Sequence, residues 1–177
     1  MIDASRKSFE ENAAITSKVV EYAHARGVVV EAEIGHVASN FNPDDTEILY
    51  TTAEEAKAFA EASGCDSMAI SIGTAHGAYK AKAIPEISFK TLGEIRAAVD
   101  IPLVLHGGSG SGDENLRRCA LEGICKVNVY TDLYLAGMAA ARESEAKDYL
   151  ALRAALKKGI SDCLKHYYSI LGTRPVR

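Results

Sequence analysis

The sequence has little cysteine, no hydrophobic run of membrane length and no excess of positive charge. Its four cysteines, Cys65, Cys119, Cys125 and Cys163, show no C-x-x-C spacing. A zinc site built from cysteines and a disulfide framework are therefore not expected. We predict that the thiols are reduced and that Cys65, Cys119 and Cys125 fill the core.

The missing hydrophobic runs and the charge pattern also limit the partners. No stretch approaches the roughly 20 apolar residues of a membrane span, and the start "MIDASRKSFEEN" lacks the layout of a signal peptide. A net charge of −4 is spread along the chain, without a basic stripe for nucleic acid or a polybasic segment for a membrane surface. We therefore expect a cytoplasmic protein that binds neither nucleic acid nor a membrane.

What is present predicts one globular α/β domain over residues 1–177, since 47% of the residues are hydrophobic and can bury a sizeable core. Helix-like periodicity covers residues 9–25, 52–63, 89–99, 113–121 and 132–141, and apolar runs cover 28–35, 67–73, 102–107 and 125–130. Such alternation predicts repeated βα units around a parallel sheet. Residues from 145 onward predict a long amphipathic helix and a tail.

The strand count leaves two architectures open. Four strands are clear, and "MID" at the start could be the end of a fifth. They could form an open α/β sheet. Alternatively, they could form the second portion of a (β/α)8 barrel, which typically needs about 250 residues, with its first three or so strands on other sequence.

Polar residues follow the predicted strands. His76 lies in "GTAHGAYK", and His106 precedes the glycine turn of "IPLVLHGGSGSGDENL". Two imidazoles at the carboxyl ends of parallel strands can meet above the sheet, and imidazole suits Zn²⁺, although a catalytic zinc usually has three protein ligands. The turn before a helix offers amides for a phosphate. A metal beside a phosphate site suggests a phosphorylated carbonyl substrate.

Five motifs resemble, in order, the strand-end motifs of the class II, zinc-dependent bisphosphate aldolases: "MIDASRKSFEEN", "VVEYAHARGVVVEAEIG", "SIGTAHGAYK", "IPLVLHGGSG" and "GICKVNVYTDL". The resemblance implies an incomplete (β/α)8 TIM barrel, from about strand 4 to strand 8 with the C-terminal helices. It also implies reversible aldol cleavage of fructose- or tagatose-1,6-bisphosphate into dihydroxyacetone phosphate and glyceraldehyde 3-phosphate. Zinc would polarise the substrate carbonyl, and the family resemblance favours a homo-oligomer.

The resemblance also implies a set of metal-site residues. His76 and His106 match two of the family's three zinc histidines, and Asp3 and Glu33 match carboxylates that border the metal. Glu31 is expected only to line a polar interior. The third histidine and the aspartate that acts as general acid and base belong to an Asp-His-Gly motif that precedes "MID" in the family, and this chain lacks it.

The candidate substrate contacts share a place in the loops after the strands: Gly77, Lys80, Gly107, Ser109, Asn128 and Thr131. By resemblance, the glycines and the serine belong to phosphate loops that also hold a monovalent cation such as Na⁺ or K⁺. Lys80 and Thr131 match phosphate contacts, and Asn128 matches a contact to the dihydroxyacetone portion. The loop at residues 36–50 departs from the family pattern, which leaves its carboxylate unassigned.

Two function classes remain open on these grounds. The chain could act as an aldolase once a complementing N-terminal segment supplies the missing strands, aspartate and histidine. Alternatively, it could be a non-catalytic relic that binds phosphate or another protein through its exposed sheet edges. A phosphosugar-binding open sheet unrelated to aldolases would have to match five ordered motifs by chance.

Overall fold

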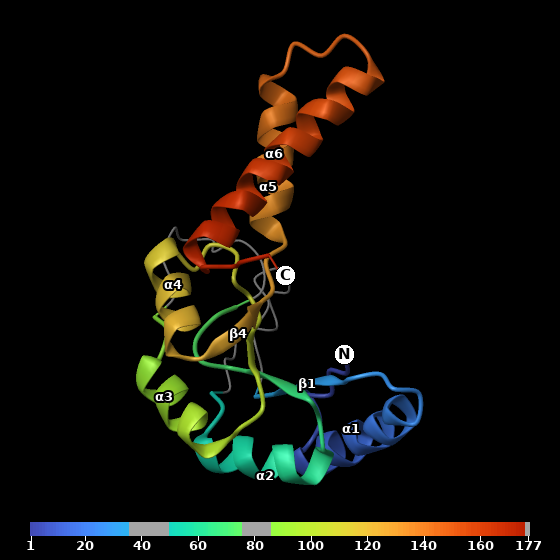
Figure 1. Ribbon diagram of the computed structural model, residues 1–177, viewed down its shortest axis with the longest axis vertical. Coiled ribbons are helices and arrows are strands. Elements are labelled where there is room, and N and C mark those ends of the chain that lie inside the picture. The colour runs from blue at the N-terminus through green and yellow to red at the C-terminus, as the bar shows by residue number, and fades with distance from the viewer. Residues whose placement is uncertain (36–49, 76–85, 176–177) are drawn as a thin grey trace.

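Strands and helices alternate along the chain in the computed structural model, which describes residues 1–35, 50–75 and 86–175 (Figure 1). In chain order the elements are α1 (Phe9–His24), β1 (Glu31–Ile34), α2 (Ala53–Ser63), β2 (Ser67–Ile70), α3 (Phe89–Ala98), β3 (Leu103–Leu105), α4 (Asp113–Glu122), β4 (Ile124–Val127), α5 (Thr131–Glu143) and α6 (Tyr149–Ile170). The predicted alternation is confirmed, and the strands are shorter than the apolar runs that predicted them.

The four strands form one parallel sheet in the order β1-β2-β3-β4. Ile2 adds a parallel bridge to Ala32 on β1, so "MID" lies alongside the first strand as expected. Each strand is therefore placed next to the preceding one in the same direction. A doubly wound sheet reverses its strand order at a switch point, whereas successive βα units of a barrel do not.

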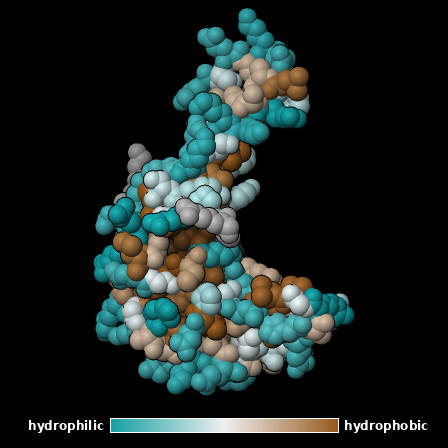
Figure 2. Space-filling view, viewed as in Figure 1, coloured by the Kyte–Doolittle hydropathy of each residue, from teal (hydrophilic) through white to brown (hydrophobic). Residues whose placement is uncertain are grey.

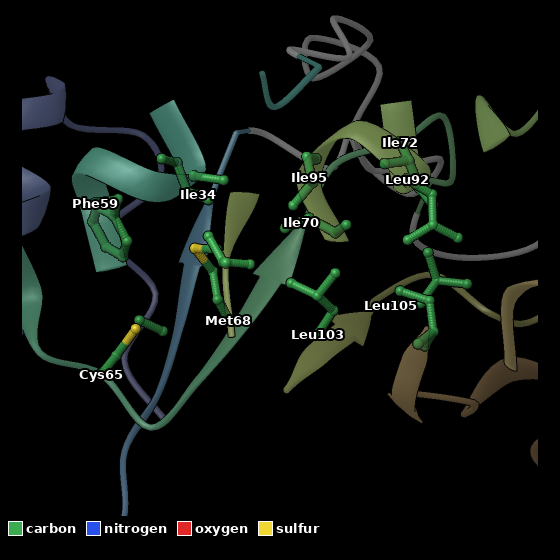
Figure 3. Packing of buried hydrophobic residues seen from close by; sticks show 14 of the residues in the cluster. Ile34, Phe59, Cys65, Met68, Ile70, Ile72, Leu92, Ile95, Leu103 and Leu105 are labelled. Atoms are coloured by element: carbon green, nitrogen blue, oxygen red, sulfur yellow. The ribbon is translucent and has the colours of Figure 1, made fainter. Parts of the chain in front are cut away.

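The two faces of the sheet differ in chemistry because side chains alternate along a strand. The outer face packs under the helices and belongs to the hydrophobic core: Ala32, Ile34, Met68, Ile70, Leu103 and Leu105 (Figure 3). Phe59 from α2 and Leu92 and Ile95 from α3 complete this layer. The alternate positions, Glu31, Glu33, Ala69, Val104 and Lys126, therefore face inward.

Polar side chains fix the first helices to the sheet. Ser8 and Thr52 begin α1 and α2 with capping boxes completed by glutamates three residues later, which satisfies amides that a helix start leaves open. The buried side chain of Asn12 on α1 donates to the Glu33 carbonyl at 2.9 Å. This bond holds the carboxyl end of β1, where a candidate residue lies.

Helices α5 and α6 pair side by side and project from the body beyond β4 (Figure 1). Their contact is close because a Cβ on Gly159 would lie 2.5 Å from the Ala136 carbonyl oxygen and 2.7 Å from the Ala140 Cβ. Although α6 is the longest helix among the described residues, none of the helices there is both long and apolar enough to cross a bilayer.

The position of β4 corrects one core assignment. Cys65 and Cys119 are buried as predicted, but Cys125 is exposed. It lies on β4, the last strand of the sheet in the described part of the chain, where no further strand pairs with it, and it lines an open groove. The alternation of a strand predicts which residues share a face, but it does not reveal that the strand lies at an edge.

Candidate functional site

His106 lies at the centre of a polar cluster on the inner face of the sheet. It follows β3 directly and is buried. Its Nδ1 lies 2.8 Å from Glu33 Oε2, and its Nε2 lies 3.1 Å from Glu31 Oε1. A protonated imidazole donates from both nitrogens, so one ring satisfies two carboxylates of β1.

Lys126 on β4 extends this cluster from the edge of the sheet opposite to β1. Its Nζ donates to Glu31 Oε2 at 2.6 Å, so β4 and β1 are joined across the inner face of the two strands between them. Ala69 and Val104 occupy the inner positions of those middle strands. Their small side chains leave room for the longer ones to meet above them.

The cluster shifts two pKa values in opposite directions. Burial favours the neutral form of His106, but the hydrogen bonds and charges of Glu33 and Glu31 outweigh burial and raise the pKa of the ring. Burial likewise favours the neutral form of Glu31, but hydrogen bonds from Lys126 and His106 lower the pKa of that carboxyl. The cluster is therefore a set of paired charges.

The donors of this cluster fit zinc in type, since imidazole nitrogen and carboxylate oxygen both ligate it. Two of the predicted metal-site residues, His106 and Glu33, are in direct contact. Within the described ranges, however, no group of three or more His, Cys, Asp or Glu side chains is arranged to hold an ion. The reason is that Glu31 and Glu33 contact different nitrogens of the His106 ring, so these donors do not converge on one point.

Of the other two predicted metal-site residues, Asp3 and His76, only Asp3 lies within the described part of the chain. Asp3 follows the Ile2 bridge and is therefore level with Glu33 in the parallel register, but its carboxylate accepts hydrogen bonds from the amide and hydroxyl of Ser5 at 3.0 and 2.7 Å. His76 lies outside the described residues, as do the substrate candidates Gly77 and Lys80. Whether His76 meets His106 therefore stays a prediction.

The glycine turn after His106 is bonded to the segment after β4. The Gly108 amide donates to the Asn128 carbonyl at 3.0 Å, and the Gly110 amide donates to Asp132 Oδ2 at 2.9 Å. Ser109 Oγ accepts from the amides of Tyr130 and Asp132 at 3.2 and 3.3 Å. The amides of Gly108 and Gly110 are therefore bonded within the protein. Ser109 Oγ acts only as an acceptor in these bonds, so its hydroxyl proton can still be donated.

Asn128 and Thr131 lie close to this turn. The Asn128 amide donates to the Leu105 carbonyl at 2.9 Å, immediately before His106, and Thr131 opens α5. The structure thus brings together His106, Glu33, Gly107, Ser109, Asn128 and Thr131 at the carboxyl ends of β1, β3 and β4.

Sequence reasoning missed Lys126 as a member of the site and treated Glu31 as structural. A signal for both existed in the inner-face alternation, because Glu31 and Glu33 are two residues apart, as are Lys126 and Asn128. No signal indicated the hydrogen bond of Tyr167 to Asp132, whose residues are 35 positions apart.

With this geometry established, comparisons with known proteins identify the family. A model of the family described as fructose-bisphosphate aldolase class-II matches residues 1–174. The chain belongs to this family. It is 37% identical over 164 residues to the uncharacterized protein YdjI of Escherichia coli K12, a match that covers 92% of this chain and 58% of YdjI.

Solved structures of aldolases match over nearly the whole chain. The crystal structure of the YdjI aldolase has a TM-score of 0.82 at 33% identity and covers 98% of this chain and 59% of that one. A putative fructose-1,6-bisphosphate aldolase from Coccidioides immitis gives 0.86 at 27% identity, covering 97% and 62%. Fructose-bisphosphate aldolase from Campylobacter jejuni gives 0.72 at 25%, covering 96% and 58%.

These matches confirm the predicted fold. The chain has an α/β fold with a parallel sheet and forms part of an aldolase TIM barrel. It spans about three fifths of the length of the relatives that it matches. The resemblance stated from the motifs is thereby confirmed, including the partial coverage.

Proposed function

We propose that this chain contributes the larger part of a class II ketose-bisphosphate aldolase. The reaction is the reversible cleavage of fructose- or tagatose-1,6-bisphosphate into dihydroxyacetone phosphate and glyceraldehyde 3-phosphate. The observation that carries the proposal is the position of His106, which is buried between Glu33 and Glu31 and leads directly into the glycine turn.

In this proposal a divalent metal such as Zn²⁺ would supply electrophilic polarisation of the substrate carbonyl. His106 and His76 would hold it, with Glu33 and Asp3 beside it as carboxylate counter-charges. Glu31 and Lys126 would support His106 from its other side. The orientation of the ring would then be fixed by hydrogen bonds, as it usually is for ligating histidines.

The glycine turn and the start of α5 would bind the substrate phosphate. Gly107 and Ser109 would contribute to this loop, together with Gly77, Lys80 and a monovalent cation such as Na⁺ or K⁺. Asn128 would contact the dihydroxyacetone portion, and Thr131 would donate its hydroxyl to the phosphate. The support for this placement is that both segments are bonded to each other at the carboxyl edge of the sheet.

The partner that we propose is a complementing N-terminal segment with the first three or so βα units. In the described part of the chain no strand pairs with the outer edge of β4. Beside that edge lies a groove of about 270 Å³. Its apolar lining includes Val127 from β4, Leu133 from α5 and Leu164 from α6. Hydrophobic side chains reach the surface in this region (Figure 2).

The test measures bound zinc and aldol cleavage for the chain alone and after mixing with the N-terminal two fifths of a relative such as YdjI. We expect both zinc and activity to rise in the mixture and to be lost when His106→Ala replaces the wild-type chain. If no combination binds zinc or cleaves either bisphosphate, the chain is a non-catalytic relic. The same assay on both sugars decides between fructose and tagatose bisphosphate.

A further inference from the structure

Three segments that are distant in sequence meet at the carboxylate of Asp132. Its Oδ2 accepts a hydrogen bond from the Gly110 amide in the glycine turn at 2.9 Å and another from the hydroxyl of Tyr167 on α6. The Asp132 amide returns a bond to Ser109 Oγ at 3.3 Å. The glycine turn and the first turn of α5 are thereby tied in both directions.

Tyr167 is held firmly enough to fix this carboxylate. The residue is only 7% exposed and belongs to the hydrophobic core. Burial and the charge of Asp132 raise its pKa, so the hydroxyl stays a neutral donor. The preceding residue, His166, lies 2.9 Å from Asp113 at the start of α4. The end of α6 therefore contacts the first turns of both helices that border the glycine turn (Figure 1).

We propose that Asp132 and Tyr167 are positioning residues that hold the glycine turn in its phosphate-binding conformation. This inference rests on the phosphate role given to the turn under the proposed function. Gly110 has a φ of +73°, so its conformation is not fixed by ordinary side-chain sterics. The bond to a carboxylate that is itself anchored by Tyr167 supplies the missing restraint.

The negative charge of Asp132 also allows the opposite role, in which the carboxylate opposes phosphate binding. The two roles predict opposite effects on phosphate affinity when the charge is removed. A carboxylate next to an anion site opposes the anion by like-charge repulsion and could compete for the Gly110 amide. As a positioning group, the carboxylate strengthens phosphate binding, and its removal weakens it. As a competitor, the carboxylate inhibits binding, and its removal strengthens it.

The experiment uses the full ¹⁵N-labelled chain and three variants: Tyr167→Phe, Asp132→Asn and the control Tyr168→Phe. The phenylalanine at position 167 keeps the buried ring and removes only the hydroxyl. Tyr168 is the next residue on the same helix and is 48% exposed. The hydrogen-exchange rate of the Gly110 amide reports the local restraint, that of Val104 in β3 reports the fold, and a titration with inorganic phosphate reports the site.

Tyr167→Phe removes the hydroxyl that anchors Asp132, and Asp132→Asn replaces the charged acceptor of the Gly110 amide by a neutral one. We therefore expect both variants to accelerate Gly110 exchange by about tenfold, with Val104 exchange unchanged. The Kd for phosphate should rise by about three- to tenfold in both variants and stay constant in Tyr168→Phe. Unaltered Gly110 exchange in Tyr167→Phe, or tighter phosphate binding by Asp132→Asn, overturns the inference. If the wild-type chain binds no phosphate, the phosphate role fails. The local restraint is then still decided by the Gly110 exchange rates alone.

Discussion

The backbone at Gly107 offers the sharpest test of how the candidate site is built. Gly107 joins His106 to the rest of the glycine turn and has a φ of +68°. A Cβ there would lie 2.6 Å from the carbonyl oxygen of Ala75, immediately before the predicted ligand at position 76. Gly27 provides a matched control, because its φ is +69° and its Cβ would meet nothing within 4 Å. The substitutions Gly107→Ala and Gly27→Ala therefore share the conformational strain and differ in the clash.

The expected magnitudes follow from these two contributions. The left-handed conformation costs an alanine about 1–2 kcal/mol, and the reduced entropy of the unfolded chain returns about 0.4–1 kcal/mol. Gly27→Ala should therefore lower the free energy of unfolding by about 1 kcal/mol. The clash with the Ala75 backbone adds about 1–3 kcal/mol of overpacking, so that Gly107→Ala should cost about 2–4 kcal/mol.

The assay is urea unfolding of both variants and the wild type, followed by far-UV circular dichroism. The difference between the two losses isolates the clash. Losses that agree within about 0.5 kcal/mol, the usual limit of such comparisons, would refute the close approach of the two strand ends. In that case the glycine turn would not pack against the backbone of Ala75.

Two further predictions concern regions outside the site. Gly159→Ala should destabilise the α5–α6 pair by about 1–3 kcal/mol through overpacking, whereas the helical control Gly93→Ala, whose Cβ meets nothing within 4 Å, should stabilise by up to about 1 kcal/mol; equal shifts in thermal unfolding would contradict the close packing. Asp66 accepts bonds from His24 at 2.9 Å and from the Val30 amide at 2.6 Å, which lower its pKa. Because the folded-state value is the lower one, this stabilisation is present above about pH 4 and lost as the pH falls through the folded pKa. Asp66→Asn should lose about 1 kcal/mol at neutral pH and show a flatter acid limb of stability against pH, and an unchanged limb would exclude this role.

Much of the fold could be predicted because its signals are local. The alternation of helical and apolar segments located every βα unit, and the "MID" stump was correctly placed beside the first full strand. The segment after β3, with Gly107 and Ser109, and the segment after β4, with Asn128 and Thr131, were both expected at one edge of the sheet, and hydrogen bonds join these two segments. In each case parallel strands bring their carboxyl ends to one edge, so that the position in the chain determines the position in space.

The remaining features depend on long-range contacts that no single segment encodes. Lys126 and Glu31 are 95 residues apart and meet only because the sheet brings β4 and β1 to one interior. The glycine turn was expected to offer its amides to an anion, but Gly110 already donates to Asp132. Cys125 was placed in the core and is exposed, because the burial of a strand depends on its neighbours.

The contact between Glu31 and Lys126 shows that the inner face of this part of the barrel forms its own ion pairs. It joins the first and last full strands within the chain itself, and His106 completes the connection from β3. Among the described residues, Glu31 and Glu33 are paired with His106, and Glu31 also with Lys126, as the burial of charged groups requires. The unsatisfied features lie elsewhere, at the outer edge of β4 and in the groove between β4 and α6. A complementing segment would therefore have to supply strand pairing and further ligands, and it would dock on an interior whose polar arrangement is already formed.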